Sequence, residues 1–131
     1  TGDIQISLFQ QAELAGAVIV STPQDLALID AQKAVDMMKR LSIPLLGLVE
    51  NMSYFVAPDT GKRYDIFGHG GAADAAPAMG MPFLGEVPLD MAIRETSDKG
   101  RPVVAAEPGG PQAAAFRAIA REILSRNPHL K

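Results

Sequence analysis

Three short turns hold the residues whose types could do chemistry in this sequence. The turns follow apolar runs and read Ser21-Thr22-Pro23, Glu50-Asn51 and Glu86-Val87-Pro88. If the runs are parallel strands, their carboxyl ends lie at one edge of a sheet, and the turns converge on one ligand site. The side-chain amide of Asn51 offers both a donor and an acceptor, which suits the edge of adenine or guanine, and a turn with proline can flank a flat ring. The alternative is that Asn51 only begins a turn.

Other catalytic patterns are missing from the sequence. We find no Ser/His/Asp order, no His-x-x-x-His and no carboxylate pair spaced for acid/base work. The stretch Gly68-His69-Gly70-Gly71 precedes a predicted helix, but its spacing matches neither Gly-x-Gly-x-x-Gly nor a Walker A loop. His69 has no second ligand nearby, which favours a turn or cap residue over a metal ligand. Because the Walker A lysine and the Walker B aspartate are absent too, we expect no catalytic residue in this chain and no nucleotide hydrolysis by it alone.

Composition narrows the function classes further. The 131 residues are 47% hydrophobic, carry a net charge of -3 and include no cysteine. An acidic chain without a Lys/Arg cluster is not expected to grip nucleic acid phosphates. No apolar run approaches the roughly 18 residues of a membrane helix, so we expect a soluble, cytoplasmic protein that does not contact a membrane. The start at Thr1-Gly2-Asp3 suggests a truncated chain that has lost a preceding strand and loop.

Hydrophobic periodicity predicts an α/β fold. The all-apolar run at 17–20 and the nearly unbroken apolar run at 43–49 suit strands that are covered on both faces, and residues 81–88 indicate a third short parallel strand. Helical spacing of apolar residues predicts helices between them, and capping signals suggest where these helices begin and end. We expect helices from Asp3 to Gly16, from Thr22 as N-cap to Leu41, a short or kinked one at 72–79 around Pro77, one from Asp90 to Lys99, and one from Pro111. Residues 101–105 are predicted to be extended.

These elements predict one domain over residues 1–131. The first two strands and the helix between them form a βαβ unit, whose crossover should be right-handed. The result is a parallel sheet with helices on both faces. Residues 53–67, around the turn Pro58-Asp59-Thr60-Gly61, predict a β-hairpin that projects from the sheet edge. A solvent-exposed loop excursion is the simpler alternative for that stretch.

Several motifs occur together in a fixed order and resemble a known family. They are Thr1-Gly2-Asp3, Ser21-Thr22-Pro23-Gln24-Asp25, Gly47-Leu48-Val49-Glu50-Asn51-Met52-Ser53, Asp65-Ile66-Phe67-Gly68 and Leu84-Gly85-Glu86-Val87-Pro88-Leu89-Asp90. Together they resemble the carboxy-terminal half of the Mrp/ApbC family of P-loop ATPases, relatives of MinD and ParA that act as iron-sulfur cluster carriers. The resemblance extends to about Val104, and its Glu-Asn-Met-Ser and Gly-Glu-Val-Pro-Leu-Asp strings are specific.

The resemblance implies roles for particular residues. Asn51 matches the family's base-recognising asparagine, and Pro88, Leu89 and Asp90 match the loop that flanks adenine. Thr1 and Gly2 match the tail of the switch loop Asp-x-Pro-Pro-Gly-Thr-Gly-Asp. The leading aspartate of that loop and the P-loop would lie upstream of residue 1, so half of the ATP site would be absent. A full-length parent would bind ATP with Mg²⁺ as a homodimer and serve iron-sulfur apoproteins.

One departure from the family pattern concerns the metal. The family usually has Cys-Pro-x-Cys in the hairpin, whereas this chain has Ala57 and Thr60 around Pro58 and Asp59. Neither side chain can replace a thiolate as a cluster ligand, so no metal ligand is predicted here. Either the cluster has been lost, or its ligands lie outside this chain. Two alternatives to the carrier function follow, namely a nucleotide-switched interaction protein like MinD or ParA, and an inactive structural fragment.

Overall fold

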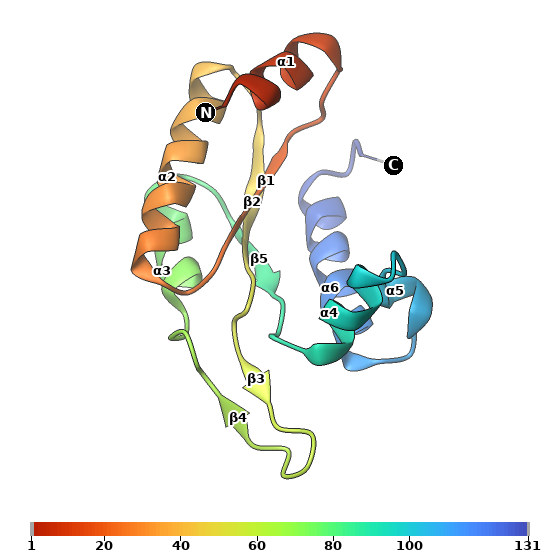
Figure 1. Ribbon diagram of the computed structural model, residues 1–131. Coiled ribbons are helices and arrows are strands. Elements are labelled where there is room, and N and C mark those ends of the chain that lie inside the picture. The colour runs from red at the N-terminus through yellow and green to blue at the C-terminus, as the bar shows by residue number, and fades with distance from the viewer. Residues whose placement is uncertain (1, 131) are drawn as a thin grey trace.

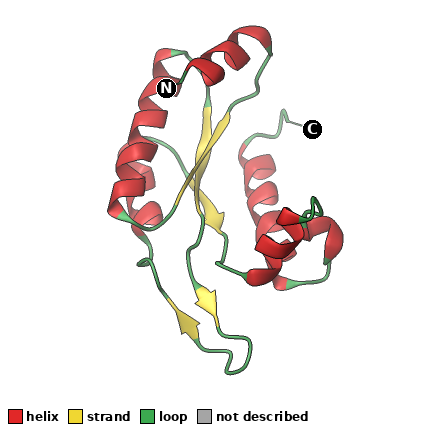
Figure 2. Ribbon diagram, viewed as in Figure 1, coloured by secondary structure: helices red, strands yellow, loops and turns green. Residues whose placement is uncertain are grey.

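A central parallel sheet organises the chain. The computed structural model describes residues 2–130. Its main sheet is 3-stranded with the order β1-β2-β5, where β1 is Ala17–Ser21, β2 is Leu45–Glu50 and β5 is Phe83–Glu86. Both pairings are parallel. The predicted parallel sheet is therefore confirmed, and the strand that precedes Asn51 lies at its centre (Figure 2).

Helices cover both faces of this sheet, as the apolar runs predict. Helices α2 (Asp25–Arg40) and α3 (Gly71–Met79) lie on one face, and α6 (Pro111–Arg126) lies on the other (Figure 1). The short helices α4 (Met91–Asp98) and α5 (Val103–Ala106) pack beside α6, while α1 (Asp3–Gln11) lies near the end of the sheet where the strands begin. None of the helices in residues 2–130 combines the length and the hydrophobicity that a membrane crossing requires.

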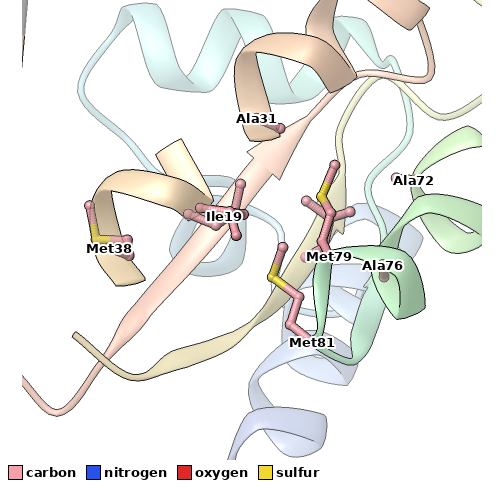
Figure 3. Packing of buried hydrophobic residues seen from close by; sticks show 9 residues of the cluster. Ile19, Ala31, Met38, Ala72, Ala76, Met79 and Met81 are labelled. Atoms are coloured by element: carbon pink, nitrogen blue, oxygen red, sulfur yellow. The ribbon is translucent and has the colours of Figure 1, made fainter. Parts of the chain in front are cut away.

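Two hydrophobic clusters hold the layers together. Neighbouring residues of β2 belong to different clusters, since Leu48 packs toward α2 and α3, whereas Val49 packs toward Ile119 of α6. This alternation is typical of a strand covered on both sides. Alanines of α3 let that helix approach the sheet closely, and methionines fill the remaining space (Figure 3). The labelled members of the larger cluster are Ile19, Ala31, Met38, Ala72, Ala76, Met79 and Met81.

Two strand glycines make the close packing near α6 feasible. A Cβ atom at Gly47 would lie 2.4 Å from Cγ of Leu84, and one at Gly85 would lie 2.9 Å from Cγ1 of Ile119. Both residues also have positive φ angles, 152° and 150°. Only glycine meets both conditions without strain.

The hairpin projects away from the main sheet at its carboxyl edge (Figure 1). It consists of β3 (Phe55–Val56) and β4 (Arg63–Tyr64), which pair in antiparallel fashion. The connecting turn ends at Gly61, whose φ is 70°. This confirms the projecting hairpin predicted over residues 53–67.

Some boundaries differ from the prediction. The second helix begins at Asp25 with Gln24 as N-cap, and the hydroxyl of Thr22 donates to Oε1 of Gln24 instead of capping the helix. The first helix ends at Gln11, well before Gly16. The predicted extended segment at 101–105 is wrong. Pro102 there begins the turn α5, because the amides of Ala105 and Ala106 both donate to its carbonyl.

Candidate functional site

The ends of the three parallel strands meet at one polar layer. Ser21, Glu50 and Glu86 end their strands, and the pairing register places Glu50 between the other two. Residues at one register level of adjacent strands face the same side of a sheet. The structure thus brings together the three turns that the sequence analysis singled out.

Backbone hydrogen bonds hold Asn51 in place just beyond this layer. Its amide donates to the carbonyl of Ser21 at 2.7 Å, while the amide of Val87 donates to the carbonyl of Glu50 at 2.8 Å. The amide of Ser53 in turn donates to the carbonyl of Val87 at 3.0 Å. The turn is therefore bonded on one side to β1 and on the other to the segment that leads to Pro88.

The half-buried side chain of Asn51 borders two hollows. One, of about 550 Å³, lies along the open edge of β1 and includes Val18 and Val20. The other, of about 300 Å³, lies between the sheet and α6, and includes Val87 and Phe116. A polar amide at the rim of an apolar hollow can orient a flat heterocycle that the hollow accepts.

The loop from Pro88 to Asp90 lines a neighbouring cavity of about 190 Å³ together with Tyr54. The amide of Leu89 donates to the carbonyl of Tyr54 at 2.7 Å. Both carboxylate oxygens of Asp90 are engaged, since Oδ1 accepts from the amide of Ala92 at 2.7 Å and Oδ2 accepts from Nε2 of Gln112 at 2.8 Å. Asp90 therefore caps α4, as predicted, and fixes the loop.

The switch-loop residues lie elsewhere. Thr1 is outside the described residues. Gly2 is the N-cap of α1, with a φ of 87°, and a Cβ there would lie 3.3 Å from Sδ of Met37. Met37 belongs to the last part of α2, at the end of the sheet opposite Asn51 (Figure 1). The structure thus brings Asn51, Pro88, Leu89 and Asp90 to one edge, but not Gly2.

A charge cluster that the sequence analysis missed sits beside the polar layer. Arg63 of the hairpin is its centre, with Nε 3.2 Å from Oδ1 of Asp65 and Nη2 3.0 Å from Nδ1 of His69. Nη2 also lies 3.8 Å from Oε2 of Glu86 in β5, and the guanidinium carbon is 4.1 Å from the ring centre of Tyr54. The hairpin stem is thereby tied to the sheet. His69, predicted as a turn or cap residue, is a member of this cluster.

Glu50, the register partner of Glu86 in this cluster, is fully buried. Neither of its carboxylate oxygens has a hydrogen-bond partner among residues 2–130, and the same holds for the hydroxyl of Ser53. Burial, and then the negative charge of Glu86, raise the pKa of Glu50, while His69 opposes the shift. The strand end thus holds a carboxyl group that is harder to ionise than an ordinary one.

The positions of the family cysteines carry no thiolate. The amide of Ala57 donates to the carbonyl of Lys62, and the hydroxyl of Thr60 accepts from the amide of Lys62, so both residues simply shape the hairpin. Within residues 2–130 no group of three or more His, Cys, Asp or Glu side chains is placed to hold a metal ion. These residues do not fit an iron-sulfur cluster.

Comparisons with known proteins agree with this arrangement. A family model described as ParA, NUBPL iron-transfer P-loop NTPase, matches residues 1–124. An iron-sulfur cluster carrier protein of Deinococcus radiodurans is 54% identical over 123 residues, which are 94% of this chain and 35% of that protein. The iron-sulfur cluster transfer protein NUBPL of Dictyostelium discoideum is 48% identical over 96% of this chain and 39% of its own length. The chain thus spans little more than a third of these two relatives.

Solved structures show the same fold. A nucleotide-binding protein from Archaeoglobus fulgidus, in complex with ADP, superposes with a TM-score of 0.70 at 38% identity, over 88% of this chain and 46% of that one. The cell division ATPase MinD of Pyrococcus furiosus gives a TM-score of 0.67 at 29% identity, over 86% and 43%. With the family model covering residues 1–124, this chain belongs to the NUBPL iron-transfer P-loop NTPases of the ParA group.

Proposed function

We propose that this chain supplies the adenine-recognition side of the ATP site in an iron-sulfur cluster carrier. The observation that carries the proposal is the convergence of Asn51 and the Pro88–Asp90 loop at the carboxyl edge of the parallel sheet. Ligands of open α/β sheets bind at that edge. The similarity to an ADP complex from Archaeoglobus fulgidus supports a nucleotide as the ligand.

The residues divide the work of base recognition. The amide of Asn51 would donate to and accept from the base edge, while Pro88 and Leu89 flank the ring. Asp90 holds the loop through its bonds to Ala92 and Gln112 rather than by contacting the base. Phosphates and Mg²⁺ would be held by a P-loop outside residues 2–130, since this chain spans little more than a third of the two relatives and its family is one of P-loop NTPases. ATP binding by the complete protein, as a cytoplasmic homodimer, is part of this proposal.

An affinity measurement tests the role of Asn51. In the full-length protein that carries this chain, Asn51→Ala is expected to weaken ATP binding about tenfold, the value of one good hydrogen bond. Asn127→Ala is the matched control, because Nδ2 of Asn127 only donates to the carbonyl of Ile123 at the end of α6. Unchanged ATP affinity in Asn51→Ala would refute the role.

The cargo is a separate question, because Ala57 and Thr60 cannot ligate iron. We propose that a cluster, if carried, uses ligands beyond this chain. This is tested by anaerobic reconstitution of the full-length protein with iron and sulfide, in which visible absorption and bound iron are measured. Stoichiometric iron supports the carrier function.

A second candidate function gains support from the missing thiolates. A protein that binds ATP without taking up iron would act as a nucleotide-dependent interaction protein, and the structural similarity to the cell division ATPase MinD supports an ATP-dependent function without iron. It would then bind partners in an ATP-dependent way in metal-free protein. Partner binding that required iron would count against this second function.

A further inference from the structure

The turn that carries Asn51 has buried polar side chains on both sides. Glu50 and Ser53 are each 0% exposed, and Oε1, Oε2 and Oγ lack hydrogen-bond partners among the described residues. Buried polar groups are nearly always paired, because an unpaired one loses its bonds to water without replacement. Because these groups are unpaired within residues 2–130, the turn that carries Asn51 is sensitive to any charge or hydrogen-bond donor that reaches them.

The backbone of the turn supports this interpretation. Met52, directly after Asn51, has a φ of 52°, a left-handed conformation that residues other than glycine rarely adopt. Bonds to Ser21 and Val87 hold the turn from both sides. Because Asn51 lies between a buried Glu50 and a strained Met52, a change at Glu50 reaches Asn51 through one peptide unit.

The groups that act on Glu50 come from β5 and from the hairpin side. Glu86 of β5 is its register partner, and Asp65 and His69 lie in the segment between β4 and α3. Glu86 and Asp65 raise the pKa of Glu50, whereas His69 lowers it, and no charged group of α2, α3 or β1 contributes. Arg63 connects these three groups through contacts of 3.0 to 3.8 Å. After burial, which is the largest cause of the shift, these charged groups beside the hairpin contribute to the electrostatic environment of Glu50.

We propose that Glu50 is a positioning residue, which couples the position of the hairpin relative to the main sheet to the orientation of the Asn51 side chain. This inference rests on the proposed role of Asn51 in base recognition. A neutral carboxyl can stay buried in the polar layer. An ionised one requires a donor or water, which the turn admits only by shifting its backbone. A partner or nucleotide that moves the hairpin changes the balance between these two forms, and thereby moves Asn51.

The coupling can be measured without nucleotide, by NMR on the uniformly ¹³C,¹⁵N-labelled full-length protein that carries this chain. The carboxyl carbon of Glu50 and the side-chain amide of Asn51 are followed from pH 4 to pH 8. We expect both signals to titrate with one midpoint. Glu86→Gln lowers that midpoint and His69→Gln raises it, whereas Asp59→Asn, at the hairpin turn, leaves it unchanged.

A double-variant comparison separates coupling from a structural effect. In Glu50→Gln we expect the side-chain amide signal of Asn51 to lose its pH dependence. Adding His69→Gln to that variant should leave the chemical shift of this signal unchanged. Two results would overturn the proposal. In Glu86→Gln, the midpoint of the Asn51 amide signal would stay unchanged while that of the Glu50 carboxyl carbon shifts; in Glu50→Gln, the Asn51 amide signal would still depend on pH. Should Glu50→Gln fail to fold, the Glu86→Gln and His69→Gln shifts decide alone. Because no nucleotide is used, this test is independent of the proposed role of Asn51 in ATP binding. The coupling can be refuted while Asn51 still binds ATP, and it can be supported while Asn51 does not bind ATP.

Discussion

Glu50 and Glu86 are register partners on the adjacent parallel strands β2 and β5, so two carboxyl groups face the same side of the sheet at its carboxyl edge. The negative charge of Glu86 disfavours the ionisation of Glu50. Arg63 offsets the charge of Glu86 from the hairpin, but Glu50 has no hydrogen-bond partner among the described residues. Within residues 2–130, the polar layer therefore contains buried groups without hydrogen-bond partners, in a sheet that is otherwise well packed.

A pH-dependent stability follows from the raised pKa of Glu50. The unfolded chain ionises Glu50 near the ordinary glutamate pKa of 4.5, while the folded chain still holds the proton. Because the folded state binds more protons in that window, this group's contribution to stability is complete below pH 4.5 and declines as the pH rises toward the folded pKa. Glu50→Gln removes the decline, since an amide side chain does not ionise in this pH range.

Urea denaturation at several pH values checks this expectation. The free energy of unfolding of Glu50→Gln, relative to the parent chain, should increase from pH 4 to pH 7. Glu107→Gln, in an exposed loop, is the control and should show no such trend. If the free energy of unfolding of the parent chain, relative to that of Glu50→Gln, instead increased with pH, the ionised carboxylate would be stabilising. That result would contradict the expectation.

Arg63 should stabilise the hairpin more than the whole domain. Its side chain is 45% exposed, so the ion pairs are screened, and the cation–π contact with Tyr54 adds only about 0.5–1 kcal/mol. For Arg63→Met we expect a loss of about 1 kcal/mol or less in global stability, but faster hydrogen exchange at the amide of Ala57. Lys62→Met, which loses a longer 5.2 Å contact to Tyr64, is the matched control. Unchanged exchange in Arg63→Met would mean that the hairpin is seated by other contacts.

Gly47 should tolerate no side chain. Gly47→Ala places a methyl group against Leu84 at a φ of 152°, so we expect a loss of about 1–3 kcal/mol from overpacking, with added backbone strain. Gly109→Ala is the control, because a Cβ at Gly109 meets nothing within 4 Å. Thermal melts of both variants decide the matter, and equal melting temperatures would show that Leu84 can move aside.

The sequence predicted the layers better than the site. The strand 43–49 and its neighbours followed from unbroken apolar runs, and Asp90 and Pro111 marked helix starts correctly. Thr22 failed as a helix cap because its hydroxyl bonds Gln24 instead. The four residues of α5 are too few for a helical period to show in the sequence.

The charge cluster could not be predicted because its members are brought together only by the fold. Arg63 of β4 and Glu86 of β5 lie on different sheets, and the fold alone brings Nη2 of Arg63 to 3.8 Å from Oε2 of Glu86. Glu50 looked like the first residue of a turn, yet it is the last residue of β2, with register partners on both sides. Burial of a carboxyl group at that position has no local signal in the sequence.

The Asp90 cap should matter for both stability and the loop. Asp90→Ala removes the bonds to Ala92 and Gln112, and we expect a loss of about 1 kcal/mol, the usual cost of an N-cap. Gln112→Ala removes only the second bond and should cost less. Denaturant unfolding of the two variants separates the cap from the loop contact. A larger loss in Gln112→Ala would mean that the loop, rather than the cap, dominates.

The open edge of β1 should drive self-association of the isolated chain. Val18 and Val20 are 36% and 59% exposed, Leu26 and Ile29 of α2 are 79% and 56% exposed, and β1 pairs only with β2 in the described residues. An apolar edge strand invites pairing with another chain, and a lysine on the edge discourages it. We expect light scattering to show concentration-dependent oligomers that Val20→Lys reduces, whereas Val56→Lys, on the exposed hairpin, does not. If light scattering showed only monomers of the parent chain at all concentrations, the open edge of β1 would not mediate self-association.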